Sequence, residues 1–329
     1  MRKTVGEVLV DLLEAYSVDT VFGIPGVHTV ELYRGLATAN IRHITPRNEQ
    51  SAGFMADGYA RVSGKPGVCL LITGPGLTNA ITAMGQARAD SIPMLIISGV
   101  NKAVDRNQEV GHLHELPDQI AMMKTIAIST ETIERGDDLE ATLDRAFAAM
   151  TAARPGPVHI EIPLDVMSEV IDIPDLTPRS APAIEAPKKL EIETAAAMCS
   201  AARRPVLLIG GGALAADVQK LAECLDAPVV TTINARGVMA EHPLLVPASP
   251  SLPSVRALLA DADLVIAAGT QFGPTDYDIY VDGAFPTLQK LIRIDVDPRQ
   301  AAKGQVADHV IIADAAVTIG EITAMLADE

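Results

Sequence analysis

The chain has 329 residues, of which 48% are hydrophobic, so it is long and apolar enough for two folded domains. Its 42 acidic residues outnumber its 26 basic ones, and the formal charge of −16 argues against nucleic acid or an anionic membrane as a partner. Glu7, Asp11 and Glu14 interrupt the N-terminal apolar run, so no signal peptide is predicted. Three scattered cysteines without a CxxC pair are typical of reduced thiols, and we expect a cytoplasmic protein.

The first half of the chain alternates helical and strand patterns. Helical periods run over residues 5–16, 47–61, 79–89 and 139–153. Between them, short apolar runs indicate buried strands at residues 20–24, 41–45, 67–73, 93–98, 125–129 and 158–162. Apolar strands separated by helices are typical of a parallel sheet that is covered on both faces. We therefore expect a doubly wound α/β domain over residues 1–171.

A linker and a second domain follow. Residues 172–188 contain four prolines and no sustained period, which is typical of an exposed linker. The alternation then restarts, with helices at residues 191–203 and 214–225, strands at 206–209, 229–233, 264–268, 291–296 and 310–313, and a last helix that ends at 329. We expect a second doubly wound α/β domain with a parallel sheet over residues 189–329.

The loops after the strands are the first places to look for a site, because open parallel sheets bind ligands at the carboxyl ends of their strands. Gly74-Pro75-Gly76 precedes a helix, and its backbone amides could hold an anion or a polar ring edge. A tight turn that needs positive φ is the competing interpretation. The segment 98–119 is longer than ordinary connections, which favours a functional loop. It contains His112 and His114, but an HxH pair without a third ligand predicts no metal site.

Glu49 lies in the first turn of the predicted helix 47–61. Asn48 could cap that helix, and the helix dipole favours an acid there without any chemistry. Small residues, however, follow on the same face and would let another helix strip water from a neighbouring carboxylate; they are Ala52, Gly53, Ala56 and Ala60. A carboxylate in such surroundings can share a proton near neutrality. Glu49 is therefore a candidate catalytic residue.

Several motifs together resemble one enzyme family. The stretches VFGIPG, RNEQSAGFMADGYAR, ITGPGLTNAITAMGQA, SIPMLIISG and RPGPVHIEIPLDV occur in this order. In combination they resemble the thiamine-diphosphate enzymes of the acetolactate synthase and 2-oxo acid decarboxylase family. Past the linker, ARRPVLLIGGGALAA, TTINARGVMAEHPL, LVIAAGTQF and LIRIDVDPRQAAKGQVADHVI look like the family's Rossmann-like central domain. The resemblance implies an enzyme that decarboxylates a 2-oxo acid and releases an aldehyde or transfers the acyl-anion unit to a second carbonyl.

The resemblance also implies roles for particular residues. The family's glutamate at the position of Glu49 bonds a ring nitrogen of the aminopyrimidine of thiamine diphosphate and favours the imino form of the exocyclic amine. The small-residue face is then expected to pack across the interface of a homodimer or homotetramer. Gly26, Val27 and His28 match the loop that approaches the thiazolium and the substrate. The turn near the pyrimidine is matched by Thr73, Gly74, Pro75, Gly76 and Asn79.

One motif departs from acetolactate synthases. His114 and Glu115 lie where those enzymes usually carry Phe-Gln-Glu, which argues against acetolactate formation. GIPGVHTVELYRGL together with LHELPDQ looks more like the branch that includes 5-guanidino-2-oxopentanoate decarboxylase. We hypothesise that His28 and His114 donate to a substrate carboxylate or relay a proton. Two polar loop residues without a role are the alternative.

The second domain gives a weaker signal. Gly210-Gly211-Gly212 resembles a dinucleotide turn but lacks the GxGxxG fingerprint. Some relatives bind flavin there, and Asp295 and Asp297 lie where the adenosine part would sit, although Asp297-Pro298 is also typical of a helix start. We favour an empty or vestigial site over bound FAD.

The family's third domain has no match. It carries a Gly-Asp-Gly and an Asn-Asn motif that hold Mg²⁺ and, through it, the cofactor diphosphate. We expect that domain, roughly 100–200 residues by ordinary domain sizes, to be missing and the chain as given to be inactive.

Two other functions stay open. One is a non-catalytic interaction or regulatory module that kept the fold, and the other is a nicotinamide or flavin oxidoreductase built on the second domain. Glu49, the Gly-Pro-Gly turn and Asn79 favour the thiamine-diphosphate enzyme over the first. The lack of GxGxxG weighs against the second.

Overall fold

The structure is a computed structural model that describes residues 2–152, 154–177, 179–180, 184–277 and 285–327. The chain divides into two compact units, Met1–Ala183 and Ile184–Glu329, and each is described by itself. The boundaries at residues 171 and 189 stay a prediction. Among the described residues, no helix is both long and apolar enough to cross a membrane.

A six-stranded parallel sheet is the centre of the first unit. Its strands are β2 (Thr20–Gly23), β3 (Arg42–Ile44), β4 (Gly67–Leu71), β5 (Met94–Val100), β6 (Ser129–Thr132) and β7 (Pro157–Pro163). They lie in the order β3-β2-β4-β5-β7-β6, so the direction of the winding reverses between β2 and β4. Such a reversal is the place where doubly wound sheets open a crevice for a ligand.

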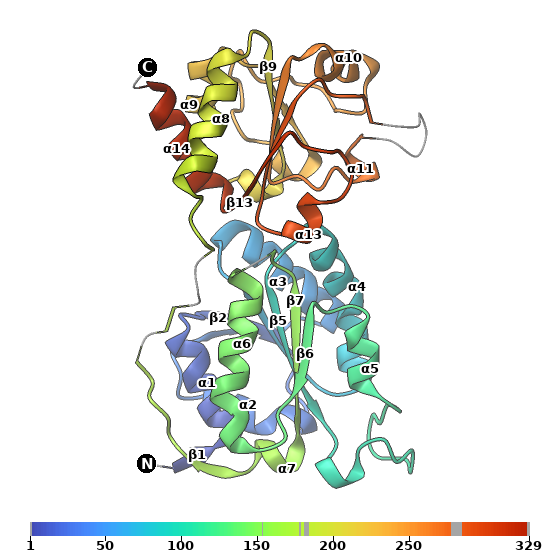
Figure 1. Ribbon diagram of the computed structural model, residues 1–329. Helices are drawn as coiled ribbons and strands as arrows, with labels where there is room; N and C mark the ends of the chain where they lie inside the picture. The colour runs from blue at the N-terminus through green and yellow to red at the C-terminus, as the bar shows by residue number, and fades with distance from the viewer. Residues whose placement is uncertain (1, 153, 178, 181–183, 278–284, 328–329) are drawn as a thin grey trace. The chain divides into compact units, whose positions relative to one another are not determined.

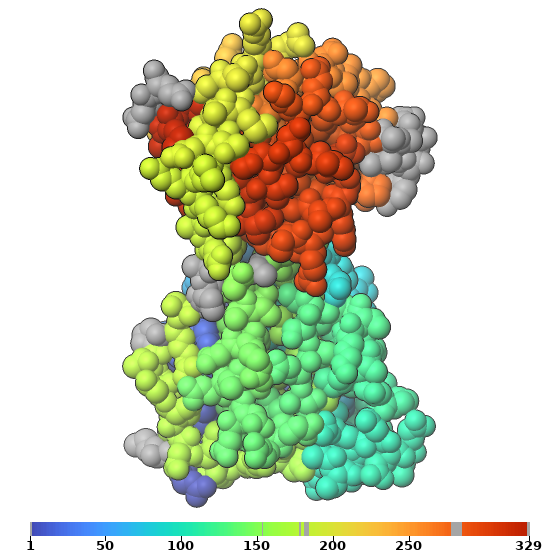
Figure 2. Space-filling view, in the orientation of Figure 1, coloured from blue at the N-terminus to red at the C-terminus, as the bar shows by residue number. Residues whose placement is uncertain are grey.

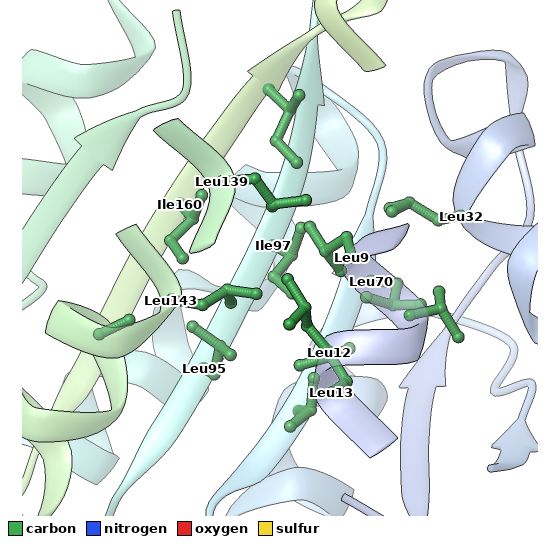
Figure 3. Close-up of a cluster of buried hydrophobic side chains, with 14 of the residues drawn as sticks. Leu9, Leu12, Leu13, Leu32, Leu70, Leu95, Ile97, Leu139, Leu143 and Ile160 are labelled. Atoms are coloured by element: carbon green, nitrogen blue, oxygen red, sulfur yellow. The ribbon is translucent and has the colours of Figure 1, made fainter. Parts of the chain in front are cut away.

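Helices cover both faces of this sheet (Figure 1). One face packs against α1 (Val5–Ala15), α2 (Val30–Leu36) and α6 (Leu139–Thr151), and the other against α3 (Glu49–Ser63), α4 (Pro75–Asp90) and α5 (Gln119–Lys124). Figure 3 shows the core of the first face, where leucines of α1 and α6 meet Leu70, Leu95 and Ile97 of the sheet. The unit also contains α7 (Leu164–Met167) and an antiparallel pair, β1 (Arg2–Thr4) with β8 (Val170–Asp172).

The strand predicted at residues 125–129 is wrong. The helix α5 ends at Lys124, and the N–H groups of Ile126 and Ala127 donate back to the carbonyl of Met123. The β-rich pattern of this stretch therefore serves a helix end, and β6 begins only at Ser129.

The small-residue face of α3 packs inside its own unit. A Cβ on Gly53 would lie 2.6 Å from the Cβ of Ala83 in α4, and the carbonyl oxygen of Ala56 is 2.1 Å from the Cβ position of Gly67 in β4. All four small residues of this face are buried in the single chain. The expectation that they meet their counterparts across a subunit interface is therefore wrong, because α4 and β4 already cover them. The pattern predicted close approach but not the identity of the neighbour.

The second unit is a five-stranded parallel sheet in the order β10-β9-β11-β12-β13. The strands are β9 (Pro205–Ile209), β10 (Val229–Thr231), β11 (Leu264–Ala268), β12 (Leu291–Asp295) and β13 (His309–Ile312). One face packs against α8 (Lys189–Ala201), α9 (Val218–Leu225) and α14 (Ala315–Ala327), and the other against α10 (Pro253–Asp261) and α11 (Pro274–Tyr277). Figure 2 shows α8 at the surface of this unit. Two α/β units with parallel sheets confirm the predicted fold class.

Part of the predicted linker is held by the first unit. Arg179 donates to the carboxylates of Glu140 and Asp144 on α6, and its backbone N–H donates to the carbonyl of Ala15. The predicted end of the helix 139–153 and the end at 329 fall on residues outside the described ones.

His159 gives the first unit a pH-dependent stability. It is fully buried in β7, with Nε2 2.8 Å from Ser98 Oγ and Nδ1 2.8 Å from Thr130 Oγ1, and burial lowers its pKa to about 3. The pKa of histidine in an unfolded chain is near 6.5. Below that pH the unfolded chain binds a proton at His159, whereas the buried ring in the folded unit stays neutral. We expect unfolding free energy to fall by up to about 1.4 kcal/mol per unit as pH drops from about 6.5 toward 3.

Denaturant titrations at pH 7, 5.5 and 4.5 measure this effect. The variant His159→Gln should lose most of the slope, whereas His112→Gln in the loop 101–118 should keep it. Equal slopes in all three proteins would contradict the assignment.

Candidate functional site

The candidate site lies where the winding of the first sheet reverses. The loop after β2 leads through Gly26 into a short 3-10 turn, Val27–Thr29, and the turn after β4 contains Thr73 and Gly74 before α4 begins at Pro75. Because β2 and β4 are neighbours in the sheet, these two loops leave the same edge side by side. The topology therefore brings together the two predicted cofactor-binding segments.

Gly74 gives the second loop its shape. Its backbone has φ 61° and ψ −116°, and a Cβ there would lie 2.3 Å from the carbonyl oxygen of His114. Both features exclude a side chain, so this position requires glycine. Gly26 and Gly76 instead pack against the side chain of Ile72 between them. The competing interpretation of the Gly-Pro-Gly turn, a tight turn that needs positive φ, is thus supported at Gly74 and not at Gly76.

Glu49 is the first residue of α3 and is half-buried. Asn48 caps this helix, since its Oδ1 accepts the N–H of Gln50 at 2.8 Å. The side chain of Asn79, one turn into α4, donates through Nδ2 to Oε2 of Glu49 at 2.9 Å. Of the hydrogen bonds among the described residues, this is the only one that reaches the Glu49 carboxylate. Its Oε1 is therefore available to a ligand, and the close α3–α4 packing fixes the pair.

The two histidines singled out from the sequence lie near each other. His28 is 2% exposed, its Nε2 lies 3.2 Å from Oδ1 of Asn101, and its ring centroid lies 6.1 Å from that of His114. Burial lowers the pKa of His28, and the neighbouring His114 lowers it further. His28 is consequently neutral at pH 7. His114 is exposed and has φ 58°, with its main chain against Gly74.

The long loop 101–118 is folded around Glu115. Its carboxylate accepts the backbone N–H groups of Glu109, Gly111 and His112 at 2.7, 2.9 and 3.0 Å. These bonds fix the loop next to His114. Within the described part of the chain, no group of three or more His, Cys, Asp and Glu side chains is arranged to hold a metal ion.

Two buried residues of this region were missed by the sequence analysis. Asn101 partners His28, and Gln119 hydrogen-bonds Thr73 and Gly74. Both line a cavity of about 230 Å³, together with Thr73, Arg106 and Glu161. Asp118, directly before Gln119, caps α5, because its side chain accepts the N–H of Ala121. The local sequence pattern, however, does not predict the hydrogen bond between Gln119 and Thr73, which are 46 residues apart.

The glycine run of the second unit packs on its own chain. A Cβ on Gly210 would lie 2.2 Å from the carbonyl oxygen of Gly269, and one on Gly212 would lie 3.0 Å from its Cα. Asp297 caps the short helix α13 (Pro298–Ala301), and its backbone N–H donates to Asp295. These features support the structural interpretation of both motifs.

The chain matches two family models and many characterised proteins. The N-terminal thiamine pyrophosphate binding domain matches residues 3–122, and the central domain of thiamine pyrophosphate enzymes matches residues 192–322. A probable 2-ketoarginine decarboxylase of Pseudomonas aeruginosa is 46% identical over 306 residues, which are 90% of this chain and 53% of that protein. The acetolactate synthase isozyme 1 large subunit of Escherichia coli is 37% identical over 314 residues, covering 92% of this chain and 54% of its own. The chain thus spans about half the length of the curated relatives it matches.

Proposed function

The chain belongs to the thiamine pyrophosphate enzymes, and from this premise we propose that it forms part of an enzyme that decarboxylates a 2-oxo acid. The product is an aldehyde, as for a lyase, or the acyl-anion unit passes to a second carbonyl, as for a transferase. The observation that carries the proposal is the Glu49 carboxylate. It is oriented by Asn79, keeps one oxygen free, and starts the helix beside the turn at the switch point.

The donor set of the site fits thiamine diphosphate. When bound, this cofactor supplies the carbanion chemistry of the reaction. In our proposal Glu49 would bond a ring nitrogen of the aminopyrimidine and share a proton with it, and Asn79 would keep Glu49 in place. The turn Thr73-Gly74-Pro75-Gly76 would hold the pyrimidine, and the loop with Gly26 and Val27 would hold the thiazolium.

The two histidines act on the substrate in this proposal. Burial favours the neutral ring of His28, which can donate a hydrogen bond through one ring nitrogen and accept one through the other without carrying a buried charge. His114 is exposed, its main chain lies next to Gly74, and its ring could donate a hydrogen bond to the substrate carboxylate. Their ring centroids lie 6.1 Å apart, which is within the range of direct ring contact, so both rings could face one substrate group beside them.

Other components are proposed from the family. Mg²⁺ and the cofactor diphosphate are held outside the two matched domains. The second unit holds no FAD, a proposal supported by the packing of its glycine run.

A homodimer or homotetramer is supported by Phe54 and Met55, which are each 43% exposed on the helix that carries Glu49. Three free cysteines support a cytoplasmic protein.

The substrate is proposed to carry a cationic end. Glu115, Asp118 and Glu161 line the cavity beside Thr73, against one cation, Arg106. These surroundings favour a guanidinium over an anionic tail, in agreement with the 2-ketoarginine for which the Pseudomonas aeruginosa relative is named. We expect the complete natural polypeptide, with thiamine diphosphate and Mg²⁺, to decarboxylate 5-guanidino-2-oxopentanoate at least about tenfold more efficiently than pyruvate, by kcat/KM.

Carbon dioxide release and product analysis decide between the alternatives. Preference for pyruvate with acetolactate as product would make this a synthase. No cofactor-dependent carbon dioxide release from either acid would instead favour the non-catalytic module.

A further inference from the structure

Gln119 uses every hydrogen-bonding position of its side chain in the buried centre of the first unit. It is the first residue of α5 and is 3% exposed. Its Oε1 accepts Thr73 Oγ1 at 2.8 Å and the N–H of Gly74 at 3.2 Å. Its Nε2 donates to Ser98 Oγ at 3.1 Å and to Glu161 Oε2 at 3.0 Å. An amide offers two acceptor positions and two N–H donors, so all four are occupied.

The chemistry of the partners fixes the orientation of this amide. A backbone N–H can only donate, so the atom facing Gly74 must be the oxygen. A carboxylate that also accepts from Thr132 and pairs with Arg106 must receive the nitrogen. Gln119 is therefore not interchangeable with an apolar residue of similar size, because its loss would leave buried polar groups without partners.

Gln119 also lies where two functional segments meet. It directly follows the loop 101–118, which carries His114, and it bonds the turn that leads into α4 and Asn79. The other end of that loop is tied by Asn101 to His28. The main chain of His114 lies next to the Cβ position of Gly74, whose N–H bonds Gln119. The turn is thus held between Gln119 and the loop that Gln119 terminates.

We propose that Gln119 is a positioning residue that locks the Thr73–Gly74 turn to the end of the loop 101–118. Through this turn it positions the Asn79–Glu49 pair, and through the loop it positions His114. A substitution at Gln119 should therefore displace the pair and His114 together. The consequence for cofactor binding rests on the proposed function, whereas the anchoring of the turn does not.

Two variants of the complete natural polypeptide test this role. Gln119→Met keeps the size and removes all of these bonds, together with the longer one of 3.5 Å from Nε2 to the carbonyl oxygen of Gly99. Gln119→Glu keeps the acceptor for Thr73 and Gly74 but places a second buried carboxylate against Glu161, so its effect should be at least as large as that of Gln119→Met. The matched control is Thr132→Val, which removes the hydroxyl bonded to the other oxygen of Glu161 at 3.0 Å and leaves the turn untouched.

Hydrogen exchange of the cofactor-free protein is the first readout. We expect peptides covering residues 72–79 and 111–116 to exchange about tenfold faster in Gln119→Met, with the second unit unchanged. Thr132→Val should exchange as the wild type does at 72–79. Unchanged exchange in both Gln119 variants, or equal acceleration in Thr132→Val, would overturn the proposal.

Calorimetric binding of thiamine diphosphate with Mg²⁺ is the second readout. We expect about tenfold weaker binding for Gln119→Met and a loss at least as large for Gln119→Glu. A wild-type protein that does not bind the cofactor, combined with faster exchange in Gln119→Met, would overturn the proposed function and support the anchoring. Wild-type affinity in a variant whose turn exchanges faster would overturn the link between the anchor and the site.

Discussion

Replacing Glu49 with Gln should lower the turnover of the complete natural polypeptide by about 10²- to 10⁴-fold, the range that a positioned acid or base contributes. Glutamine keeps the shape of the side chain and an oxygen that can accept from Asn79 Nδ2, so the pair between α3 and α4 survives. It cannot share a proton with a bound ring nitrogen. The loss should therefore fall on the chemical step, with kcat reduced more than cofactor affinity.

Stability is the control for this variant. Removing a first-turn carboxylate weakens the helix-dipole interaction by about 0.3–1 kcal/mol. Glu140→Gln removes a first-turn carboxylate from α6, far along the chain from the site, and should lower the melting temperature by a similar or larger amount because it also bonds Arg179. Near-normal turnover of Glu49→Gln, or an equal loss in Glu140→Gln, would refute the proton-sharing role.

The layered fold could be predicted because its signals are local. Apolar runs such as Leu264–Ala268 lie between helical periods, and they form the parallel strands of both sheets. Two helix starts could be predicted because capping is also local. The side chains of Asn48 and Asp297 accept the N–H groups of the residues two positions later. The strand predicted at 125–129 failed because a helix end uses the same residue types as a strand, and only the backbone bonds to Met123 decide between them.

The arrangement of the site could be predicted only in part. The switch point follows from the strand order, which places the loops of His28 and Gly74 together. The pairing of Asn79 with Glu49 spans 30 residues, and the four bonds of Gln119 join four segments. Such contacts depend on which helix packs against which strand. The small residues of α3 illustrate the limit, since their pattern predicts a close neighbour and the fold makes that neighbour α4.

The turn at Gly74 is the point on which these contacts converge. Gln119 accepts its N–H, the main chain of His114 lies next to its Cβ position, and α4 with Asn79 begins directly after it. A displacement of this one residue therefore moves both a candidate substrate residue and the partner of Glu49.

Gly74→Ala should consequently abolish function while most of the unit stays folded. Alanine at φ 61° and ψ −116° costs about 1–3 kcal/mol of backbone strain, and its Cβ would lie 2.3 Å from the His114 carbonyl oxygen, so the turn or the loop must shift. We expect thiamine diphosphate affinity and kcat/KM each to fall by about 10²-fold or more, measured by calorimetry and by carbon dioxide release.

Gly85→Ala is the matched control, because Gly85 lies in the same helix and a Cβ there meets nothing within 4 Å. It should leave function unchanged and stabilise the helix by up to about 1 kcal/mol. Hydrogen exchange of Gly74→Ala should be faster at residues 72–79 and 111–116 and unchanged in β5 and β7. Wild-type affinity in Gly74→Ala would mean that the turn does not shape the cofactor site, since this substitution cannot be made without moving it.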